Sequence, residues 1–410
     1  MPPLENQQLE ANVGYDVLVV GGGIQGCGIA QAAAAAGYRV LLIERNDWGS
    51  GTSSRSSKLI HGGLRYLESG QFSLIRKALK ERQLLLEIAP DLVKAVPFLL
   101  PVYRSGPLQN HRGDVALYSG LQIYRWLGRE LDHAAISCDF DRFDGDDPEL
   151  SNLLGEGFER DELEAVYRYW DAQTDDRLLT RAVAYSARQL GADVSKGWEL
   201  SHAQPCEYGW RVDLNHGIKR HRIEATAIVN ACGPWVTQLH QRIFGAPEPL
   251  QSELVQGSHI VIEGSLGSAV YYLEATDQRG IFVMPWGQDT LVGTTEVAFK
   301  GDPALCQPSV EEVDYLRENV RRYFPDLQVQ IKAKFAGLRV LPHGDGGVFH
   351  RARDTRLQNY WSEGRGLVSV YGGKLTTYRI TAQRVIEELQ PYLGLRQPLA
   401  DTATLKLVPH

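Results

Sequence analysis

A dense cluster of hydroxyl, glycine and basic residues occupies the segment from Thr52 to Glu68. Hydroxyl and backbone N–H groups bind phosphates, paired glycines let a backbone lie against a flat heteroaromatic ring, and Arg or Lys side chains attract anions. The structural alternative is a polar loop ahead of an amphipathic helix, predicted from Ser73 to Ile88. The candidate binding residues of this cluster are Thr52, Ser53, Ser54, Ser56, Ser57, Lys58, Leu59, His61, Gly62, Gly63 and Leu64, with Arg65 as an anion ligand.

A glycine motif nearer the N-terminus predicts a second binding element. The apolar run from Tyr15 to Val20 is typical of a buried parallel strand, and Gly-Gly-Gly-Ile-Gln-Gly follows it directly. In this G-x-G-x-x-G pattern Gly21 permits a tight turn, and Gly23 lets the backbone approach a pyrophosphate. Gly26 lets the following helix pack closely on the strand. The motif therefore predicts a nucleotide site.

The next elements complete a dinucleotide-binding unit. The alanine-rich stretch from Ile29 to Ala36 predicts a helix that ends at Gly37 and whose N-terminus faces the phosphates. A second buried strand, Tyr38 to Ile43, ends at Glu44, close to the spacing of the acid that binds a ribose 2′-hydroxyl. A carboxylate there would repel a 2′-phosphate, so the unit favours FAD or NAD over NADP. Its further candidate contacts are Ile24, Gln25 and Arg45.

Length and composition indicate a globular protein with room for more than one core. For 410 residues, two domains or one domain with a large insertion is expected. The net charge of −7 gives no basic surface for nucleic acid. The five cysteines form no C-x-x-C pair, so no metal site is expected, and they indicate reduced thiols in the cytoplasm. The polar first residues are unlike a secretion signal, and no run is apolar enough to span a membrane, although contact with a membrane surface stays open.

Later elements are predicted from periodicity and from glycine and proline positions. Pro97, Pro101 and Pro107 indicate an exit into a second domain. A helix is predicted from Asp171 to Leu190. Short β-rich runs between Gln251 and Val297, separated by glycine turns, predict an antiparallel sheet that could cover a bound cofactor.

Two further strands lead into glycine-containing turns. The strand from Arg222 to Asn230 precedes Gly233-Pro234, where proline can begin a helix. The strand from Leu367 to Tyr371 precedes Gly372-Gly-Lys374 and a helix through about Leu389. The positive end of that helix, together with the Lys374 ammonium, would stabilise an anion.

The order of these segments resembles the FAD-dependent glycerol-3-phosphate dehydrogenases, a branch of the D-amino-acid-oxidase-like flavoproteins. The segment from Thr52 to Glu68 carries the resemblance most strongly. The likeness runs from about residue 15 to about residue 390, nearly the whole chain. Four other stretches agree with it: Val229-Asn-Ala-Cys-Gly-Pro-Trp235, Gln256-Gly-Ser-His-Ile-Val-Ile262, Ala336-Gly-Leu-Arg-Val-Leu341 and Tyr371-Gly-Gly-Lys-Leu-Thr-Thr-Tyr378.

The sequence also departs from that family in three places. Longer members carry a C-terminal helical domain, and this chain stops at His410 without one, so the resemblance is to a short form. Val340 stands where many relatives have proline. His350-Arg-Ala-Arg-Asp354 is a modified version of the family's second arginine segment, which loosens the assignment of the substrate.

The resemblance implies a Rossmann-like α/β FAD-binding domain of the glutathione-reductase and D-amino-acid-oxidase type, with an inserted α+β substrate domain built on an antiparallel sheet. The FAD-binding domain would comprise residues 15–95, 171–247 and 335–395, the substrate domain or cap 96–170 and 248–334, and the C-terminal tail 396–410. FAD would be bound non-covalently, because no cysteine or histidine lies in a recognised attachment motif. The additional cofactor contacts that the resemblance implies are Ala231, Gly233, Trp235, Gly337, Leu338, Gly373, Lys374, Leu375 and Thr376.

The implied reaction is oxidation of sn-glycerol 3-phosphate to dihydroxyacetone phosphate by hydride transfer to flavin N5, with electrons passing on to a quinone or oxygen. His61 and His259 are the candidate bases, since histidine titrates near neutral pH. A structural role is the alternative for each of them taken singly. Lys374 is the candidate charge beside the reduced flavin.

Three arginines are candidate clamps for the substrate phosphate. Arg65, Arg339 and Arg353 qualify because a guanidinium group binds oxyanions with two hydrogen bonds, and Arg351 could replace Arg353. A surface charge is the alternative for each arginine taken singly. Glycine and hydrophobic strand residues surround Arg65 and Arg339, which favours these two.

Two other functions stay open at this point. An FAD-dependent oxidase or dehydrogenase of another small hydroxy acid or amino acid is favoured if the altered Arg351–Arg353 segment binds a carboxylate. A non-catalytic flavin-binding regulatory protein is the second, but cofactor binding alone would not need so many polar groups around one pocket. The expected partners are a small phosphorylated polyol and a quinone or oxygen, without nucleic acid. The expected location is the cytoplasm, free or peripheral at the inner face of the membrane.

Overall fold

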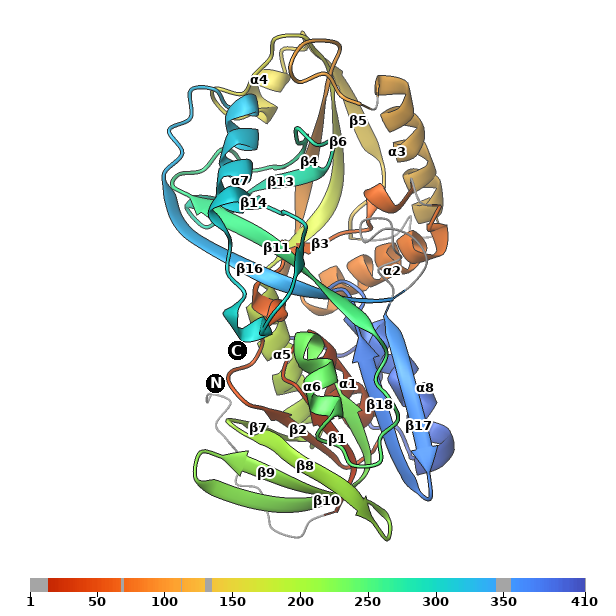
Figure 1. The fold of residues 1–410 in the computed structure, drawn as a ribbon. Helices are drawn as coiled ribbons and strands as arrows, with labels where there is room; N and C mark the ends of the chain where they lie inside the picture. Colours follow the sequence, from red (N-terminus) through yellow and green to blue (C-terminus); the bar gives the residue numbers. More distant parts are fainter. Residues whose placement is uncertain (1–13, 68–69, 112, 130–134, 344–354, 410) are drawn as a thin grey trace.

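A computed structural model describes residues 14–67, 70–111, 113–129, 135–343 and 355–409. Figure 1 shows two lobes, each built on one β-sheet, with two long strands, β11 (Ser252–Ile262) and β16 (Ile331–Pro342), reaching from the upper lobe toward the lower one. These two strands pair antiparallel along most of their length. These two strands therefore connect the upper lobe to the lower one.

The lower lobe carries a largely parallel sheet with the strand order β17-β18-β10-β1-β2-β7. Alternate residues of β1 face opposite layers: Val17 and Val19 pack against helices, whereas Leu18 and Val20 pack against the β8–β9 hairpin. The sheet is thus buried on both faces, as the continuous apolar strands predict. Its strands are β1 (Gly14–Val20), β2 (Val40–Glu44), β7 (Asp193–Lys196), β8 (Glu199–Cys206), β9 (Gly209–His216), β10 (Lys219–Asn230), β17 (Arg356–Ser362) and β18 (Arg365–Tyr371).

Three helices cover one face of the lower sheet. They are α1 (Ile24–Ala35), α5 (Asp176–Gln189) and α8 (Tyr378–Leu393), and they share one apolar core with the strands. Helix α1 begins directly after Gly23, and a short helix α6 (Val236–His240) follows β10 through a 3₁₀ turn at Gly233–Trp235. This is the strand–glycine–helix unit that the sequence predicts.

The upper lobe carries a mixed sheet with the strand order β15-β11-β14-β13-β12-β4-β6-β3. Helix α7 (Val310–Tyr323) packs on one face, and α2 (Phe72–Ile88) with α3 (Asp114–Gly128) packs on the other. The run from β11 through β14, β13 and β12 is antiparallel, as predicted. The other elements of this lobe are β3 (Leu59–Ile60), β4 (Val93–Tyr103), β5 (Phe140–Asp144), α4 (Leu150–Leu153), β6 (Leu163–Thr174), β12 (Val270–Glu274), β13 (Gly280–Trp286), β14 (Asp289–Gly293) and β15 (Val297–Phe299).

The structure corrects three predictions of local structure. Pro97 and Pro101, predicted to mark an exit into a second domain, both lie inside strand β4. The predicted helix from Asp171 is strand β6 as far as Thr174, and helix α5 begins after Asp175, whose side chain caps it. The last helix begins at Tyr378 and not directly after the glycine pair at 372–373, so Lys374 lies in a loop.

The predicted domain boundaries can be compared with sheet membership. The boundaries at 95/96, 170/171 and 334/335 fall inside β4, β6 and β16, which all belong to the upper sheet. The boundary at 247/248 falls between α6 and β11, where the chain changes sheets. A division into FAD-binding and cap domains remains a prediction, and the sheets favour placing all of β4, β6 and β16 in the cap.

Candidate active site

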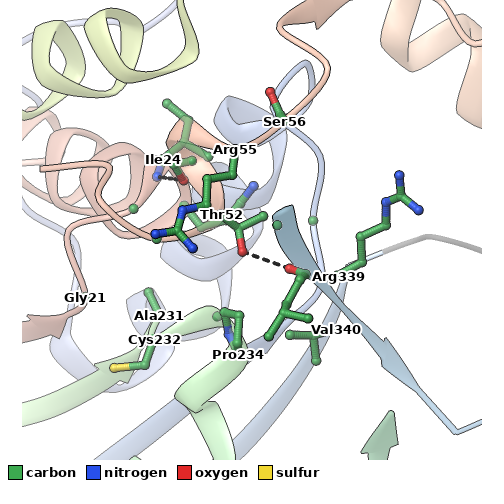
Figure 2. Close-up of a pocket in the computed structure, with 18 of the residues that line it drawn as sticks. Gly21, Ile24, Thr52, Arg55, Ser56, Ala231, Cys232, Pro234, Arg339 and Val340 are labelled. Carbon is green, nitrogen blue, oxygen red and sulfur yellow. Dashed lines mark hydrogen bonds between the residues drawn. The ribbon is translucent and has the colours of Figure 1, made fainter. Parts of the chain in front are cut away.

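A single cavity of about 610 Å³ runs between the two lobes. Its walls include the glycine loop after β1, the Thr52–Ser57 segment, the end of β10, strands β11 and β16, and the loop after β18. Figure 2 shows Gly21, Ile24 and Ala231 on one side of this pocket and Arg339 on another. Six segments of the chain thus share one cavity.

Glu44 lines the end of the cavity next to the glycine loop, which is called the nucleotide end below. Its Oε2 accepts a hydrogen bond from the backbone N of Gly22 at 2.6 Å, and its Oε1 accepts one from Asn46 N at 2.8 Å. The carboxylate therefore fixes the glycine loop while also lining the cavity. Its predicted contact with a ribose hydroxyl fits this position and remains a prediction.

The hydroxyl cluster lies on the N-terminus of α1. Ser53 Oγ accepts a hydrogen bond from Ile24 N at 2.9 Å, and Thr52 Oγ1 donates one to Leu338 O of β16 at 2.8 Å (Figure 2). Gly23 at the helix start offers no side-chain cap, and the first turn holds no acidic residue. A helix N-terminus of this kind attracts an anion such as a pyrophosphate.

The loop after β18 lines the same cavity and contacts two other wall residues, Gln25 and Tyr66. Gln25 Nε2 donates to Lys374 O at 3.2 Å, and the Lys374 ammonium lies 3.9 Å from the centre of the Tyr66 ring. Because α8 begins at Tyr378, the charge at this wall comes from the Lys374 side chain and not from a helix end. Lys374 therefore lines the cavity, and its predicted role beside an anion there remains a prediction.

His259 is held in a narrow slot at the cap end of the cavity. Its side chain is buried, its Nε2 lies 3.0 Å from Ser57 Oγ, and its ring stacks on Phe335 with centroids 4.9 Å apart. On the other side is Gly293, where any Cβ would lie 2.0 Å from the ring. Burial, with the charges of Arg339 and Lys58 nearby, lowers the pKa of His259 to about 3. The imidazole is therefore neutral at physiological pH.

The lowered pKa of His259 predicts a pH-dependent stability. The unfolded chain protonates this histidine near pH 6.5 and the folded one only near pH 3, so the free energy of unfolding falls as the pH drops through that interval. Between pH 7.5 and pH 5 the contribution is at most about 2 kcal/mol. Urea unfolding of the parent and of His259→Gln measures it: the parent should lose more stability than the variant, and parallel losses would contradict the assignment.

Arg339 lies in the cavity wall on β16 with a carboxylate beside it. Its Nη1 is 3.3 Å from Glu296 Oε1, and the side chain is 27% exposed. Gly257 on the paired strand leaves room for the guanidinium, because a Cβ there would lie 3.0 Å from Nη2. His61 also lines the cavity, near Phe282, so both candidate bases and one candidate clamp reach it.

Several predicted residues lie elsewhere. Within the described residues, Gly26, Ser54, Lys58, Gly62, Gly63 and Leu64 are not part of the cavity wall. The Lys58 ammonium forms a buried ion pair with Asp176 at 2.6 Å and supports the loop from behind. The Arg65 side chain and Arg353, with Arg351, lie outside the described residues. The other predicted contacts that line the cavity are Gly21, Gly23, Arg45, Ser56, Leu59, Ala231, Gly233, Trp235, Gly337, Gly373, Leu375 and Thr376.

The sequence reading missed residues at both ends of the cavity. At the nucleotide end these are Trp198, Glu199 and Arg242, and toward the cap they include Arg55 and Thr294. Their residue types carry no distinguishing pattern, and only the pairing of distant strands brings them to the wall. Arg55 is the exception, because it lies inside the hydroxyl cluster from Thr52 to Glu68, where an arginine could have been counted among the candidate anion ligands.

The cavity fits an extended dinucleotide. It continues from the α1 N-terminus and Glu44 to His259 and Arg339, so both a nucleotide and a second ring system have room. Two buried polar atoms on its wall, Gln25 Oε1 and His259 Nδ1, have no hydrogen-bond partner among the described residues. Such groups are expected to meet a ligand or water. No cluster of metal-ligating side chains occurs in the part of the chain that the structure describes.

Comparison with known proteins agrees with this geometry. The family model of FAD dependent oxidoreductases matches residues 16–379. Glycerol-3-phosphate dehydrogenase of Pseudomonas aeruginosa is 39% identical over 394 residues, covering 93% of this chain and 72% of its own length. D-erythritol 1-phosphate dehydrogenase of Brucella abortus is 34% identical, covering 92% and 75%. The solved structure of glycerol-3-phosphate dehydrogenase from Bacillus halodurans, complexed with FAD, matches with a TM-score of 0.73 at 28% identity, covering 96% of this chain and 67% of that one.

The chain therefore belongs to the family of FAD-dependent oxidoreductases, and its fold class and cofactor are those that the sequence predicts. Within this family it is similar to the glycerol-3-phosphate dehydrogenases, so the resemblance drawn from its motifs is confirmed.

Proposed function

We propose that this protein oxidises sn-glycerol 3-phosphate to dihydroxyacetone phosphate with FAD as the bound oxidant. The observation that carries the proposal is the single cavity, which joins the nucleotide elements around Glu44 to His259 and Arg339. The similarity to glycerol-3-phosphate dehydrogenases supports the substrate.

Different residues at the cap end of the cavity bind the phosphate and accept the proton of the substrate. Arg339 binds the phosphate, because a guanidinium group matches its oxygens and Glu296 already orients it. The imidazole of His259, which is neutral at physiological pH, and that of His61 are the candidates that accept the proton of the substrate hydroxyl. When bound, FAD supplies the acceptor for the hydride that leaves the secondary carbon. Lys374 then balances the negative charge gained in the cavity.

Product analysis tests the proposal. The purified protein is incubated with sn-glycerol 3-phosphate and an artificial two-electron acceptor, and dihydroxyacetone phosphate is measured, with one acceptor molecule reduced per molecule of product. Absence of the ketone while the protein holds FAD would contradict the substrate assignment. D-Erythritol 1-phosphate belongs in the same assay, because a relative at 34% identity is named for it.

FAD should be released intact when the protein is denatured. The cavity wall supplies hydrogen-bonding groups and charges for the cofactor, and its one cysteine, Cys232, has an Sγ already directed at Val20 O, 3.3 Å away. Acid precipitation should leave a yellow supernatant and a colourless pellet. Flavin that stays with the pellet would show a covalent bond.

We also propose that electrons leave for a quinone at a membrane surface. None of the helices in the described residues combines the length and apolarity that a membrane span requires. Helix α3 instead exposes Val115, Tyr118, Ile123 and Trp126, with the last 64% exposed. Arg125, which pairs with Asp139 at 2.7 Å, and Arg129, directly after the helix, add positive charge near these residues that would attract anionic headgroups.

Vesicle binding tests the role of α3. Sedimentation with vesicles that contain anionic lipid should retain the parent protein. Trp126→Ser should weaken binding by about tenfold, because an exposed aromatic side chain that would insert into the lipid is lost. Tyr208→Ser, at a 79% exposed tyrosine of the lower lobe, is the matched control. Equal binding of all three proteins would exclude this surface, and oxygen would then be the simpler acceptor.

A further inference from the structure

Helix α2 buries two adjacent residues of opposite charge, Glu81 and Arg82. Their exposures are 3% and 0%, although charged residues rarely leave water without a specific partner. Each forms an ion pair with a different part of the chain, and neither lines the cavity. Ala78, one turn earlier on the same helix, does line it.

The Arg82 side chain supports the loop that carries His61. Its Nη1 lies 2.7 Å from Asp171 Oδ1, and that oxygen accepts a hydrogen bond from Gly62 N at 3.2 Å. The Tyr124 hydroxyl donates to the same carboxylate at 3.2 Å and occupies the space that a Cβ on Gly62 would need. Arg82 thereby fixes the backbone next to a candidate base.

The Glu81 side chain supports the loop that carries Lys374. Its carboxylate accepts hydrogen bonds from Arg379 Nη2 at 2.5 Å and Arg379 Nε at 3.1 Å. Arg379 is the second residue of α8, and the neighbouring Tyr378 packs against Gly28 of α1. The start of α8, and with it the preceding cavity loop, is therefore held by a two-point contact.

We propose that the Glu81–Arg82 pair is a positioning device that sets both His61 and Lys374 relative to the flavin. Adjacent residues of α2 hold the loop of His61, through Arg82–Asp171, and the loop of Lys374, through Glu81–Arg379. A shift in either ion pair would therefore displace a side chain that lines the cofactor cavity. Displacements of this kind lower the reaction rate without removing a chemical group. The inference rests on FAD binding and not on the identity of the substrate.

Glu81→Gln tests the Lys374 arm. Sulfite adds reversibly to oxidised flavin, and a positive charge close to the ring favours the adduct. The variant should bind sulfite about tenfold more weakly and lose about tenfold in kcat, with KM within about twofold because Arg339 belongs to another strand. Arg379→Lys, which keeps the charge but loses the two-point contact, should lie between the parent and Glu81→Gln.

Two further variants complete the test. Tyr124→Phe, on the His61 arm, should lower kcat and leave sulfite affinity at the parent value, since it does not touch the Lys374 loop. Glu224→Gln removes a carboxylate from an exposed pair with Arg211 and should match the parent in every measurement.

The proposal would be overturned if Glu81→Gln kept the kcat and the sulfite affinity of the parent, even if its thermal stability fell. If Glu81→Gln does not fold, unchanged sulfite affinity in Arg379→Lys decides against it. The sulfite comparison needs no substrate, so a protein that fails to oxidise glycerol 3-phosphate would contradict the proposed function without deciding this inference.

Discussion

Replacing Arg339 with methionine should lower kcat/KM for glycerol 3-phosphate by about 30- to 1000-fold while FAD stays bound. The side chain lies on the cavity wall, over Gly257 and beside Glu296. Methionine keeps the length of the side chain and removes the charge that would meet the phosphate. Steady-state kinetics with an artificial acceptor, together with the flavin content of the variant, measure both effects.

Glu296 and unphosphorylated glycerol provide the controls for Arg339. The double variant Arg339→Met/Glu296→Gln removes the carboxylate that loses its ion pair, so it separates loss of the phosphate contact from misplacement of Glu296. Glycerol turnover should fall much less than glycerol 3-phosphate turnover in both variants. Parent-like turnover of glycerol 3-phosphate would show that Arg339 is no clamp, and loss of FAD would show that its role is structural.

Gly26→Ala should weaken FAD binding by about a hundredfold. A Cβ on Gly26, in the first turn of α1, would lie 1.9 Å from the backbone carbonyl oxygen of Gly21, in the loop that follows β1. The glycine loop would have to move, and its phosphate-binding geometry would be lost. The ratio of flavin to protein absorbance after gel filtration measures retention.

Gly14→Ala is the matched control for Gly26→Ala. Gly14 lies in the same strand–helix unit, and a Cβ there would meet nothing within 4 Å. This variant should retain FAD like the parent. A Gly26→Ala protein with full flavin content would contradict the role given to the glycine loop.

Patterns within short stretches of sequence predicted the β1–α1 unit correctly. The incorrectly predicted elements, β4 and the start of α5, depend on pairing between strands that are far apart in the sequence. The β1–α1 unit follows from apolar runs and glycines that are neighbours in sequence. Pro97 and Pro101 suggested an exit into a second domain, but β4 continues through both of them. Strand β12 pairs with β4 only at Phe98 and Leu99, so the rest of that edge needs no N–H donor. The spacing of the segment from Asp171 to Leu190 predicts a helix, yet pairing with β4 makes its first four residues part of a strand.

The site shows the same division. Residue types marked the hydroxyl cluster, and the family resemblance added His259 and Arg339. Of these groups, Thr52, Ser53, Ser56, Ser57, His259 and Arg339 line one cavity. The partners that set their chemistry could not be read from spacing. Asp176 lies 118 positions beyond Lys58, and Glu296 lies 43 positions before Arg339. Such pairs are visible only when the two sheets are assembled.

The anaerobic reduction of the bound flavin tests the central claim most directly. The purified yellow protein is mixed, without oxygen, with sn-glycerol 3-phosphate, D-erythritol 1-phosphate, glycerol, hydroxy acids or amino acids in separate cuvettes, and the flavin absorption band is followed. We expect glycerol 3-phosphate to bleach the band at micromolar to millimolar concentrations, glycerol to bleach it far more slowly, and amino acids to leave it unchanged. Bleaching by an amino acid or a hydroxy acid, with glycerol 3-phosphate inert, would contradict the account.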